Sequence, residues 1–552
     1  MNGDASILSL LQHPNAKTTI LAGAGISMVR PSELPSGREL LEQTLSTLIT
    51  DEALIETFNA ITEEDGWIKI VPETIFQRVW DILGYLPMES FKPLALAPFN
   101  AVHVLLADAS KNEYIDIFTT NFDCLIERAA SEQIDVKHIH GSIDDPNSMF
   151  VTIRRVGRGL EEEIGNHFAS SLISSDTLLV LGYSGNDNDV MHVISNHAPS
   201  QIVWLVRDAD GEEWAKSNCE RFHLRNVKYV RCDLADLTEG VPCLNSVSPN
   251  STDCPALFDG GRKMLSIGDQ TEILVGCLQQ MDLFGKSLKL VEVALRNKSL
   301  MSMTKERRIS LALLASHAEN RLNNQEDAIG YCERARTMLE SVFEPALDLR
   351  FRLNTQWGLA LLDQNPPQIG EARDRLKEAL RIAEKRAQNA GRDKLTFLGQ
   401  AYHNLGYVES VAIMEGKAPS DSKAIYFYKK ALGIKRKCGD LNYLQSTLCH
   451  LAAHRIVNER RMNICIDGRD TDDSVDTPNG NPKELKEFTR LCNHYNRRWD
   501  YAYFWAMLAW LAYRSDREDA GRFARYAKAL FTEIPNQDEQ IEKLDELLRK
   551  CE

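Results

Sequence analysis

A buried strand that leads directly into a glycine turn is the feature that most restricts how this chain can fold. Residues 18–22 read Thr-Thr-Ile-Leu-Ala, and Gly23-Ala24-Gly25-Ile26-Ser27 follows them. Glycine allows tight backbone angles and close approach, so such a turn can bring backbone N–H groups against a phosphate. Because many α/β proteins carry a G-x-G turn for packing alone, the turn by itself indicates only a loop that suits a phosphate.

Short apolar runs separated by longer mixed segments continue from this strand to about residue 233. The runs are Thr19–Ala22, Ile115–Thr119, Val136–His140, Thr177–Gly182, Ile202–Val206 and Val227–Val230. Near-continuous Val, Ile and Leu are typical of strands covered on both faces, and helical spacing lies between the runs. The alternation predicts an α/β domain over residues 1–242, with a doubly wound, mostly parallel, Rossmann-like sheet.

The second half of the chain has a different pattern. Residues 243–268 are rich in Pro, Ser, Asn, Asp and Gly and are predicted to be a linker. From residue 269 to 552, small or apolar residues recur at i, i+4 and i+7 on single helix faces. The clear sets are Ala328/Cys332/Ala335, Ala372/Leu376/Ala379, Ala424/Tyr428/Ala431 and Ala520/Ala524/Ala527.

Each of these sets follows another apolar helix, which resembles tetratricopeptide repeats, whose unit is about 34 residues. The spacing leaves room for one decayed unit, with Leu444–Ile456 and Leu485–Cys492 as its helices. An irregular helical bundle is the alternative. The acidic segment 467–482 lacks EF-hand spacing and a closing Glu, so we expect a solvated loop there and no calcium site.

Composition excludes several classes of function. A net charge of −15 without a long basic run argues against a nucleic-acid binder. The cysteines are dispersed without a C-x-x-C pair, as in a reduced cytoplasmic protein, and no zinc module is expected. No signal peptide and no apolar window of about 18 residues is found, so no membrane association is expected.

Polar residues follow three further predicted strands. Thr120-Asn121-Phe122-Asp123 ends one strand, where Asn121 or Asp123 could equally cap the next helix. His138 and His140, two residues apart, are expected on one face of another strand. No third ligand has a recognisable spacing, so we predict no metal, and His140 beside Gly141 suits proton transfer better. The fourth strand ends in Gly182-Tyr183-Ser184-Gly185-Asn186-Asp187, which is either a ligand contact or a simple tight turn.

Together these motifs resemble the sirtuin superfamily in their order, spacing and position, over about residues 15–235. The resemblance implies NAD+ as the bound substrate. No metal is expected, because the C-x-x-C pairs of the family's zinc module are missing. It implies a cofactor-binding set of Gly23, Ala24, Gly25, Ser27, Arg38, Gly182, Ser184 and Asp187. Ala24, Gly25 and Ser27 would line the phosphate site, and Gly182 and Ser184 would contact the adenosine half.

The same resemblance implies the catalytic residues. Asn121 and Asp123 would hold the nicotinamide ribose and the nicotinamide amide, and His140 would be the general base that activates a ribose hydroxyl. Two departures matter, since the zinc module is missing and the family's G-I-P-D-F-R pattern is replaced by residues 33–40, Glu-Leu-Pro-Ser-Gly-Arg-Glu-Leu. Whether Arg38 takes the role of the family's arginine stays open.

A zinc-less sirtuin domain joined to repeats resembles bacterial defence-associated sirtuins, which are NAD+-cleaving effectors of antiphage abortive infection. The resemblance implies an NAD+ glycohydrolase that forms homo-oligomers, with repeats that sense a phage protein. Two alternatives remain: an NAD-dependent protein deacylase or ADP-ribosyltransferase, and a non-enzymatic nucleotide-sensing scaffold.

Overall fold

The chain forms two compact units. The computed structural model describes residues 11, 16–62, 71–222, 224–237, 265–281, 283–296, 303–342, 346–388, 395–438, 441–458, 483–494, 498–514, 516–534 and 538–552. One unit comprises Met1–Thr50 and Pro72–Met264, and the other comprises Asp51–Val71 and Leu265–Glu552. The segment 467–482 and the predicted linker up to residue 264 lie outside the described residues.

A parallel sheet forms the centre of the first unit. Its strands are β1 (Thr18–Ala22), β2 (Ile115–Thr119), β3 (Val136–His138), β4 (Thr177–Leu181), β5 (Gln201–Val206) and β6 (Val227–Arg231). All neighbours are parallel, in the order β3-β2-β1-β4-β5-β6. This is the doubly wound order whose switch point lies beside β1, between β1 and β4. The predicted fold class is therefore confirmed.

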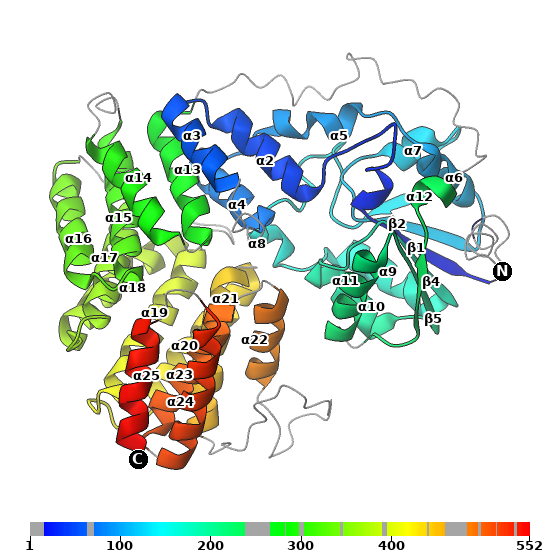
Figure 1. Ribbon diagram of the computed structural model, residues 1–552. Coiled ribbons are helices and arrows are strands. Elements are labelled where there is room, and N and C mark those ends of the chain that lie inside the picture. Colours follow the sequence, from blue (N-terminus) through cyan, green and yellow to red (C-terminus); the bar gives the residue numbers. More distant parts are fainter. Residues whose placement is uncertain are drawn as a thin grey trace. The chain divides into compact units, whose positions relative to one another are not determined.

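Helices cover both faces of this sheet (Figure 1). One face packs on α6 (Ala101–Ala109), α7 (Leu125–Ala129) and α12 (Leu234–Leu237). The opposite face packs on α9 (Glu162–Ser174), α10 (Asn188–His197) and α11 (Ala209–Arg221). The alternation of β1 explains this arrangement, since Ile20 and Ala22 belong to the first core and Leu21 to the second.

Further helices complete the described part of the first unit. These elements are η1 (Ala24–Ile26), α2 (Gly37–Leu48), α4 (Pro72–Leu83), η3 (Met88–Phe91), α5 (Lys92–Leu96) and α8 (Ile153–Val156).

The strand predicted to reach His140 ends at His138, because the chain turns at Gly141, whose φ is 78°. His140 therefore lies beyond the strand, and the alternation argument that placed it on one face with His138 fails.

The second unit is helical throughout its described residues. Its helices are α3 (Glu52–Thr62), α13 (Ile267–Gln280), α14 (Phe284–Arg296), α15 (Lys305–Arg321), α16 (Gln325–Glu340), α17 (Leu347–Leu362), α18 (Ile369–Ala387), α19 (Thr396–Met414), α20 (Ser422–Cys438), α21 (Leu441–Asn458), α22 (Lys483–His494), α23 (Arg498–Ala512), α24 (Arg517–Thr532) and α25 (Asp538–Cys551). The segment 51–71, which the sequence places in the first domain, groups with this unit. The Asp51 N–H donates to Gln270 Oε1 at 3.1 Å.

The predicted small-residue sets lie on α16, α18, α20 and α24, and all their side chains are buried. Each of these helices follows an apolar partner helix, as in tetratricopeptide repeats, and α21 and α22 form the decayed unit. Small residues let the paired helices approach closely. A Cβ on Gly406 of α19 would lie 2.6 Å from Cε1 of Tyr428 on α20.

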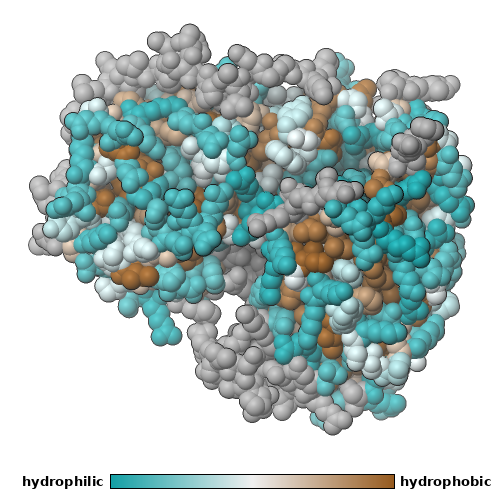
Figure 2. All heavy atoms as spheres, turned by 180° about the vertical axis from the view of Figure 1, so that it is seen from behind, coloured by the Kyte–Doolittle hydropathy of each residue, from teal (hydrophilic) through white to brown (hydrophobic). Residues whose placement is uncertain are grey.

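Exposed apolar groups are scattered. Figure 2 shows one face on which hydrophilic residues predominate and apolar patches lie between them. Such a mixture is usual for the surface of a folded protein. Within the described ranges no single helix is both long and apolar enough to cross a bilayer; only the bent pair Met88–Leu96 and Ala101–Ala109, which turns by 74°, passes such a test.

The close contact of α19 and α20 can be tested with two glycine substitutions. Gly406→Ala should destabilise the helical unit by about 1–3 kcal/mol, because the new methyl group meets the buried Tyr428 ring. Gly433→Ala on α20 meets no atom within 4 Å and should stabilise it by up to about 1 kcal/mol. Urea unfolding followed by circular dichroism measures both. Equal stabilisation by the two variants would contradict the packing described here.

Candidate functional site

The glycine turn after β1 packs directly on the backbone that follows β4. The Gly25 N–H donates to the Gly182 carbonyl at 2.8 Å, and the Gly23 N–H donates to the Leu181 carbonyl at 2.9 Å. A Cβ on Gly23 would lie 2.7 Å from the Gly182 oxygen, and Gly182 has a φ of +60°. The glycines are therefore required for packing, whatever the turn binds. Ala24 is exposed and is the first residue of η1, where an N–H has no partner within the helical turn itself.

A buried serine joins the turn to the end of β2. His103 Nδ1 accepts the Asn100 N–H at 3.0 Å, so Nε2 carries the proton and donates to Ser27 Oγ at 3.1 Å. Burial lowers the pKa of His103 to about 3, so this ring is neutral. Asn121 Nδ2 also donates to Ser27 Oγ at 3.1 Å, and Ser27 donates to Asp123 Oδ2 at 3.0 Å. All the hydrogen-bonding capacity of the Ser27 hydroxyl is therefore used to fix Asn121 and Asp123.

This arrangement leaves one side-chain oxygen of Asn121 available. Its buried Oδ1 has no hydrogen-bond partner among the described residues. The loop is held in place because the Thr120 N–H donates to the Ala22 carbonyl at 3.0 Å and the Asn121 N–H to Thr119 Oγ1 at 3.1 Å. An unsatisfied buried polar atom costs about 1–3 kcal/mol. A rigid, unpaired acceptor of this kind is suited to accept a hydrogen bond from a ligand.

Asp123 differs from an ordinary surface carboxyl. Burial raises its pKa, and the hydrogen bonds from Ser27 and from the Leu125 N–H oppose that increase only in part. The Leu125 N–H contact at 3.3 Å belongs to the start of α7. The N-cap residue of α7 is Cys124, without a side-chain cap hydrogen bond, so Asp123 is not the cap that one reading of the sequence allows. Asp123 accepts from the first N–H of the helix and belongs to the Ser27 network as well.

His138 contacts the backbone of the loop that carries Asn121. Its Nδ1–H donates to the Asn121 carbonyl at 2.8 Å, and Nε2 lies 2.7 Å from Glu127 Oε1. Burial by itself lowers the pKa of His138, but the interactions with Cys124 and Glu127 outweigh burial and raise the pKa to about 10. The two histidines of the sequence motif thus have separate partners.

His140 lies in a buried ion pair. Its Nε2 is 3.2 Å from Asp189 Oδ2, with side-chain exposures of 8% and 4%. Its ring stacks on Phe150 with the centroids 5.7 Å apart. Burial lowers the pKa of His140, whereas Asp189, Asp187 and Glu73 raise it to about 9. The neighbouring carboxylates therefore outweigh burial, and they hold the pKa of His140 above neutrality.

The carboxyl groups near His140 also have altered pKa values. Burial raises the pKa of Glu73 to about 7, with smaller contributions from Asp187 and Asp189. Burial also raises the pKa of Asp187, while His140 lowers it. Glu73, Asp187 and Asp189 form an acidic cluster around the His140 ring, in which burial opposes the ionisation of Glu73 and Asp187.

Most of the predicted residues therefore converge at the carboxyl edge of the sheet. The Ser27 network contains Asn121 and Asp123. Between these two residues, the Phe122 carbonyl accepts the Ile143 N–H at 2.7 Å, and this hydrogen bond joins the Asn121 loop to the loop after His140. Asp187 stands at the N-cap of α10. Ser184 is exposed in the turn after β4, and Arg38 is exposed on the first turn of α2.

Sequence reasoning missed His103, Asp189 and Glu73. His103 is 76 residues from Ser27 and Asp189 is 49 residues from His140, so no local spacing relates them. Asp189 lies in the first turn of α10, two residues after the predicted site residue Asp187. This short distance along the chain is the one signal in the sequence that could have indicated Asp189. Glu73 is in the first turn of α4 and had no signal.

Comparison with known proteins identifies a SIR2-like domain model that matches residues 129–203. Similar solved structures include a Sir2 in complex with an inhibitor, 2′-O-acetyl-ADP-ribose and a deacetylated peptide, at 21% identity and a TM-score of 0.24, covering 40% of this chain and 100% of that one. Another is a STAND protein with a tetratricopeptide repeat sensor from Pyrococcus horikoshii, at 11% identity and a TM-score of 0.34, covering 100% of this chain and 95% of that one. No curated protein sequence matches the chain significantly.

The charge state of His140 provides a test of this geometry. Asp189→Asn removes the negative charge beside the imidazolium, while burial still disfavours the charged ring. The pKa of His140 should therefore fall from about 9 by at least about one unit. Histidine ring NMR titration measures this change, with the exposed Asp176→Asn as the control. An unchanged titration in Asp189→Asn would mean that the ion pair does not exist in solution.

Proposed function

We propose that the α/β unit hydrolyses NAD+ to nicotinamide and ADP-ribose, with release of one proton. The observation that carries the proposal is the buried Oδ1 of Asn121, unpartnered among the described residues and held at the carboxyl edge of the sheet by the Ser27 network. In doubly wound sheets, nucleotides bind at this edge. The SIR2-like match over residues 129–203 supports the same class of ligand.

The residues fit the separate parts of NAD+. The Ala24 N–H donates to the pyrophosphate, next to the point where Gly23 and Gly25 contact the backbone of Gly182. Arg38 is a further contact for the phosphates. Asn121 Oδ1 accepts a hydrogen bond from a ribose hydroxyl or from the nicotinamide amide, and Asp123 supports the nicotinamide half. Ser184 contacts the adenosine half. The acidic cluster suits the positive charge of the nicotinamide ring.

The chemistry requires few groups. The bond between the ribose C1′ and the nicotinamide nitrogen breaks, and nicotinamide leaves as a neutral molecule because it carries positive charge in NAD+. No proton is needed to expel it. Water supplies the new C1′–O bond and loses a proton, so the site needs an oriented water and a proton acceptor. We assign orientation to Asn121 and proton acceptance, directly or through a ribose hydroxyl, to His140 in its neutral form.

Hydrolysis is favoured over deacylation by a feature of the sequence. The zinc module and adjoining groove of sirtuins help to accept acyl-lysine peptides, and this sequence has no C-x-x-C pair. Water is then the simplest acceptor of the ADP-ribosyl group.

We extend the proposal to regulation: the helical unit binds a phage protein and releases the activity in the cytoplasm, because an unrestrained NADase would kill its host. Helical solenoids provide extended binding surfaces for such a role, and the same resemblance favours homo-oligomers.

Substitution of the two central residues tests the proposal. Asn121→Ala and His140→Ala should each lower NAD+ hydrolysis at least about 100-fold, because they remove the orienting group and the proton acceptor. Chromatography of nicotinamide and ADP-ribose measures the rate, in purified protein and in cells with and without phage. Asn147→Ala, at an exposed turn, is the matched control and should retain the parent rate.

The products separate the alternatives. Release of O-acyl-ADP-ribose with an acyl-peptide would indicate deacylation, and a labelled protein would indicate ADP-ribosyl transfer. Tight NAD+ binding without turnover in phage-infected cells would indicate a nucleotide-sensing scaffold. Full activity of Asn121→Ala would contradict the assignment of the site.

The pH dependence tests the role of His140. If neutral His140 accepts the proton, kcat/KM rises with pH and reaches a plateau above about pH 9, where the ring has lost its proton. Asp189→Asn lowers that pKa, so its plateau should begin at a lower pH, at a reduced height. Steady-state rates across the pH range, corrected for uncatalysed loss of NAD+, provide the measurement. A rate that falls with increasing pH would mean that His140 acts as a proton donor instead.

A further inference from the structure

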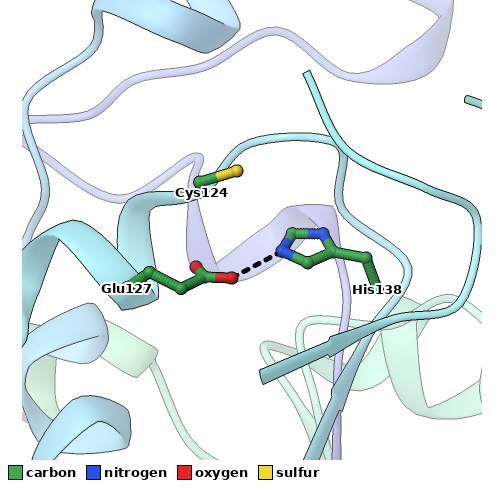
Figure 3. A group of neighbouring side chains, drawn as sticks. All are labelled: Cys124, Glu127 and His138. Carbon is green, nitrogen blue, oxygen red and sulfur yellow. Dashed lines mark hydrogen bonds and ion pairs between the residues drawn. The ribbon is translucent and has the colours of Figure 1, made fainter. Parts of the chain in front are cut away.

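Three side chains that can bind a metal ion lie close together beside the Asn121 loop. Figure 3 shows Cys124, at the start of α7, Glu127 on that helix, and His138 at the end of β3 turned toward one another. One ligand atom from each residue lies within 4.8 Å of the other two. From this juxtaposition we propose that Cys124, Glu127 and His138 bind a divalent transition metal of the zinc class, and that the bound ion fixes the loop carrying Asn121 and Asp123.

The donor set favours this class of metal. Thiolate, imidazole and carboxylate are the protein ligands of Zn2+, whereas a thiolate disfavours Mg2+ and Ca2+. Bond lengths of about 2.0–2.3 Å place tetrahedral ligand atoms about 3.2–3.8 Å apart. To enclose an ion, His138 Nε2 and Glu127 Oε1, which are 2.7 Å apart, would separate by about 0.5 Å. Ligand atoms that now lie up to 4.8 Å apart would approach by about 1 Å, with water as the fourth ligand.

The orientation of His138 fits a metal ligand. Its Nδ1–H donates to the Asn121 carbonyl at 2.8 Å, which leaves Nε2 facing Glu127 at 2.7 Å. Metal-binding histidines commonly hold one ring nitrogen on a carbonyl in this way and present the other to the ion. Independently, Glu127 Oε2 is buried without a hydrogen-bond partner among the described residues, so a further carboxylate oxygen is available.

Binding of the ion is balanced by the release of protons. The ligand forms are a thiolate, a carboxylate and a neutral imidazole, so the proton leaves Cys124 Sγ and His138 presents Nε2 without a proton. The thiolate and the carboxylate together offset the two positive charges of the ion, so the occupied site carries no uncompensated charge in this buried location.

The site is joined directly to the candidate NAD+ residues. His138 contacts the backbone of Asn121, and Cys124 follows Asp123 in the chain. An ion would therefore link both ends of the 121–124 segment to β3 and α7. This site differs from the zinc module of sirtuins, which uses C-x-x-C pairs. Metal binding does not depend on NAD+ hydrolysis, whereas the positioning role rests on the proposed function.

Metal titration of the full chain tests the site. Chelator-treated protein should bind Zn2+ by calorimetry, and Cys124→Ser and Glu127→Gln should each bind one equivalent fewer or at least tenfold more weakly. The control Cys551→Ser, at the C-terminal helix, should match the parent. Co2+ should produce thiolate-to-cobalt charge-transfer absorption that Cys124→Ser abolishes. Circular dichroism verifies that each variant is folded.

The outcomes are independent of NAD+ turnover. Failure of the parent to bind Zn2+, or an unchanged titration in both folded variants, would overturn the site. Hydrogen exchange of residues 121–124 should slow with Zn2+ in the parent and remain unchanged in Glu127→Gln. Binding without slower exchange would overturn the positioning role.

Discussion

The backbone contact between the turn after β1 and Gly182 after β4 is the interaction on which the site depends. β1 pairs with both β2 and β4. There is no room for a Cβ at Gly23 or Gly25 in the turn after β1, or at Gly182 after β4. The turn is therefore held against β4 while the chain continues to Ser27. This geometry brings the Ser27 hydroxyl to the end of β2, where it fixes Asn121 and Asp123.

Two kinds of polar environment then lie at one sheet edge. The Ser27 network is neutral at its centre, because buried His103 carries no charge and serves to orient the hydroxyl. The His140 cluster is charged, because Asp189 and its acidic neighbours hold a proton on the ring. The first environment can position a ligand without changing its protonation, whereas the second can exchange a proton. Hydrolysis of NAD+ needs both functions.

The sequence predicts those features that leave a local pattern. The six strands, the small-residue helix faces and the strand-end residues Asn121 and Asp123 follow from periodicity and short motifs, and the structure has them at the expected elements. His140 lies in the turn after β3 and not in the strand. Partners distant in sequence cannot be predicted in this way: His103 and Asp189 reach the site only through the fold. The pKa of His140 cannot be predicted in this way either, since the carboxylates that raise it come from other elements. The grouping of Cys124 and Glu127 with His138 likewise depends on the pairing of β2 with β3.

The structure of the His140→Ala variant with bound NAD+ tests the account most directly, because that variant should bind the dinucleotide and turn it over slowly. The account predicts the pyrophosphate at the Ala24 turn and the nicotinamide ribose or its amide within hydrogen-bond distance of Asn121 Oδ1. A dinucleotide bound elsewhere on the chain, or bound with Asn121 Oδ1 still unpartnered, would contradict it.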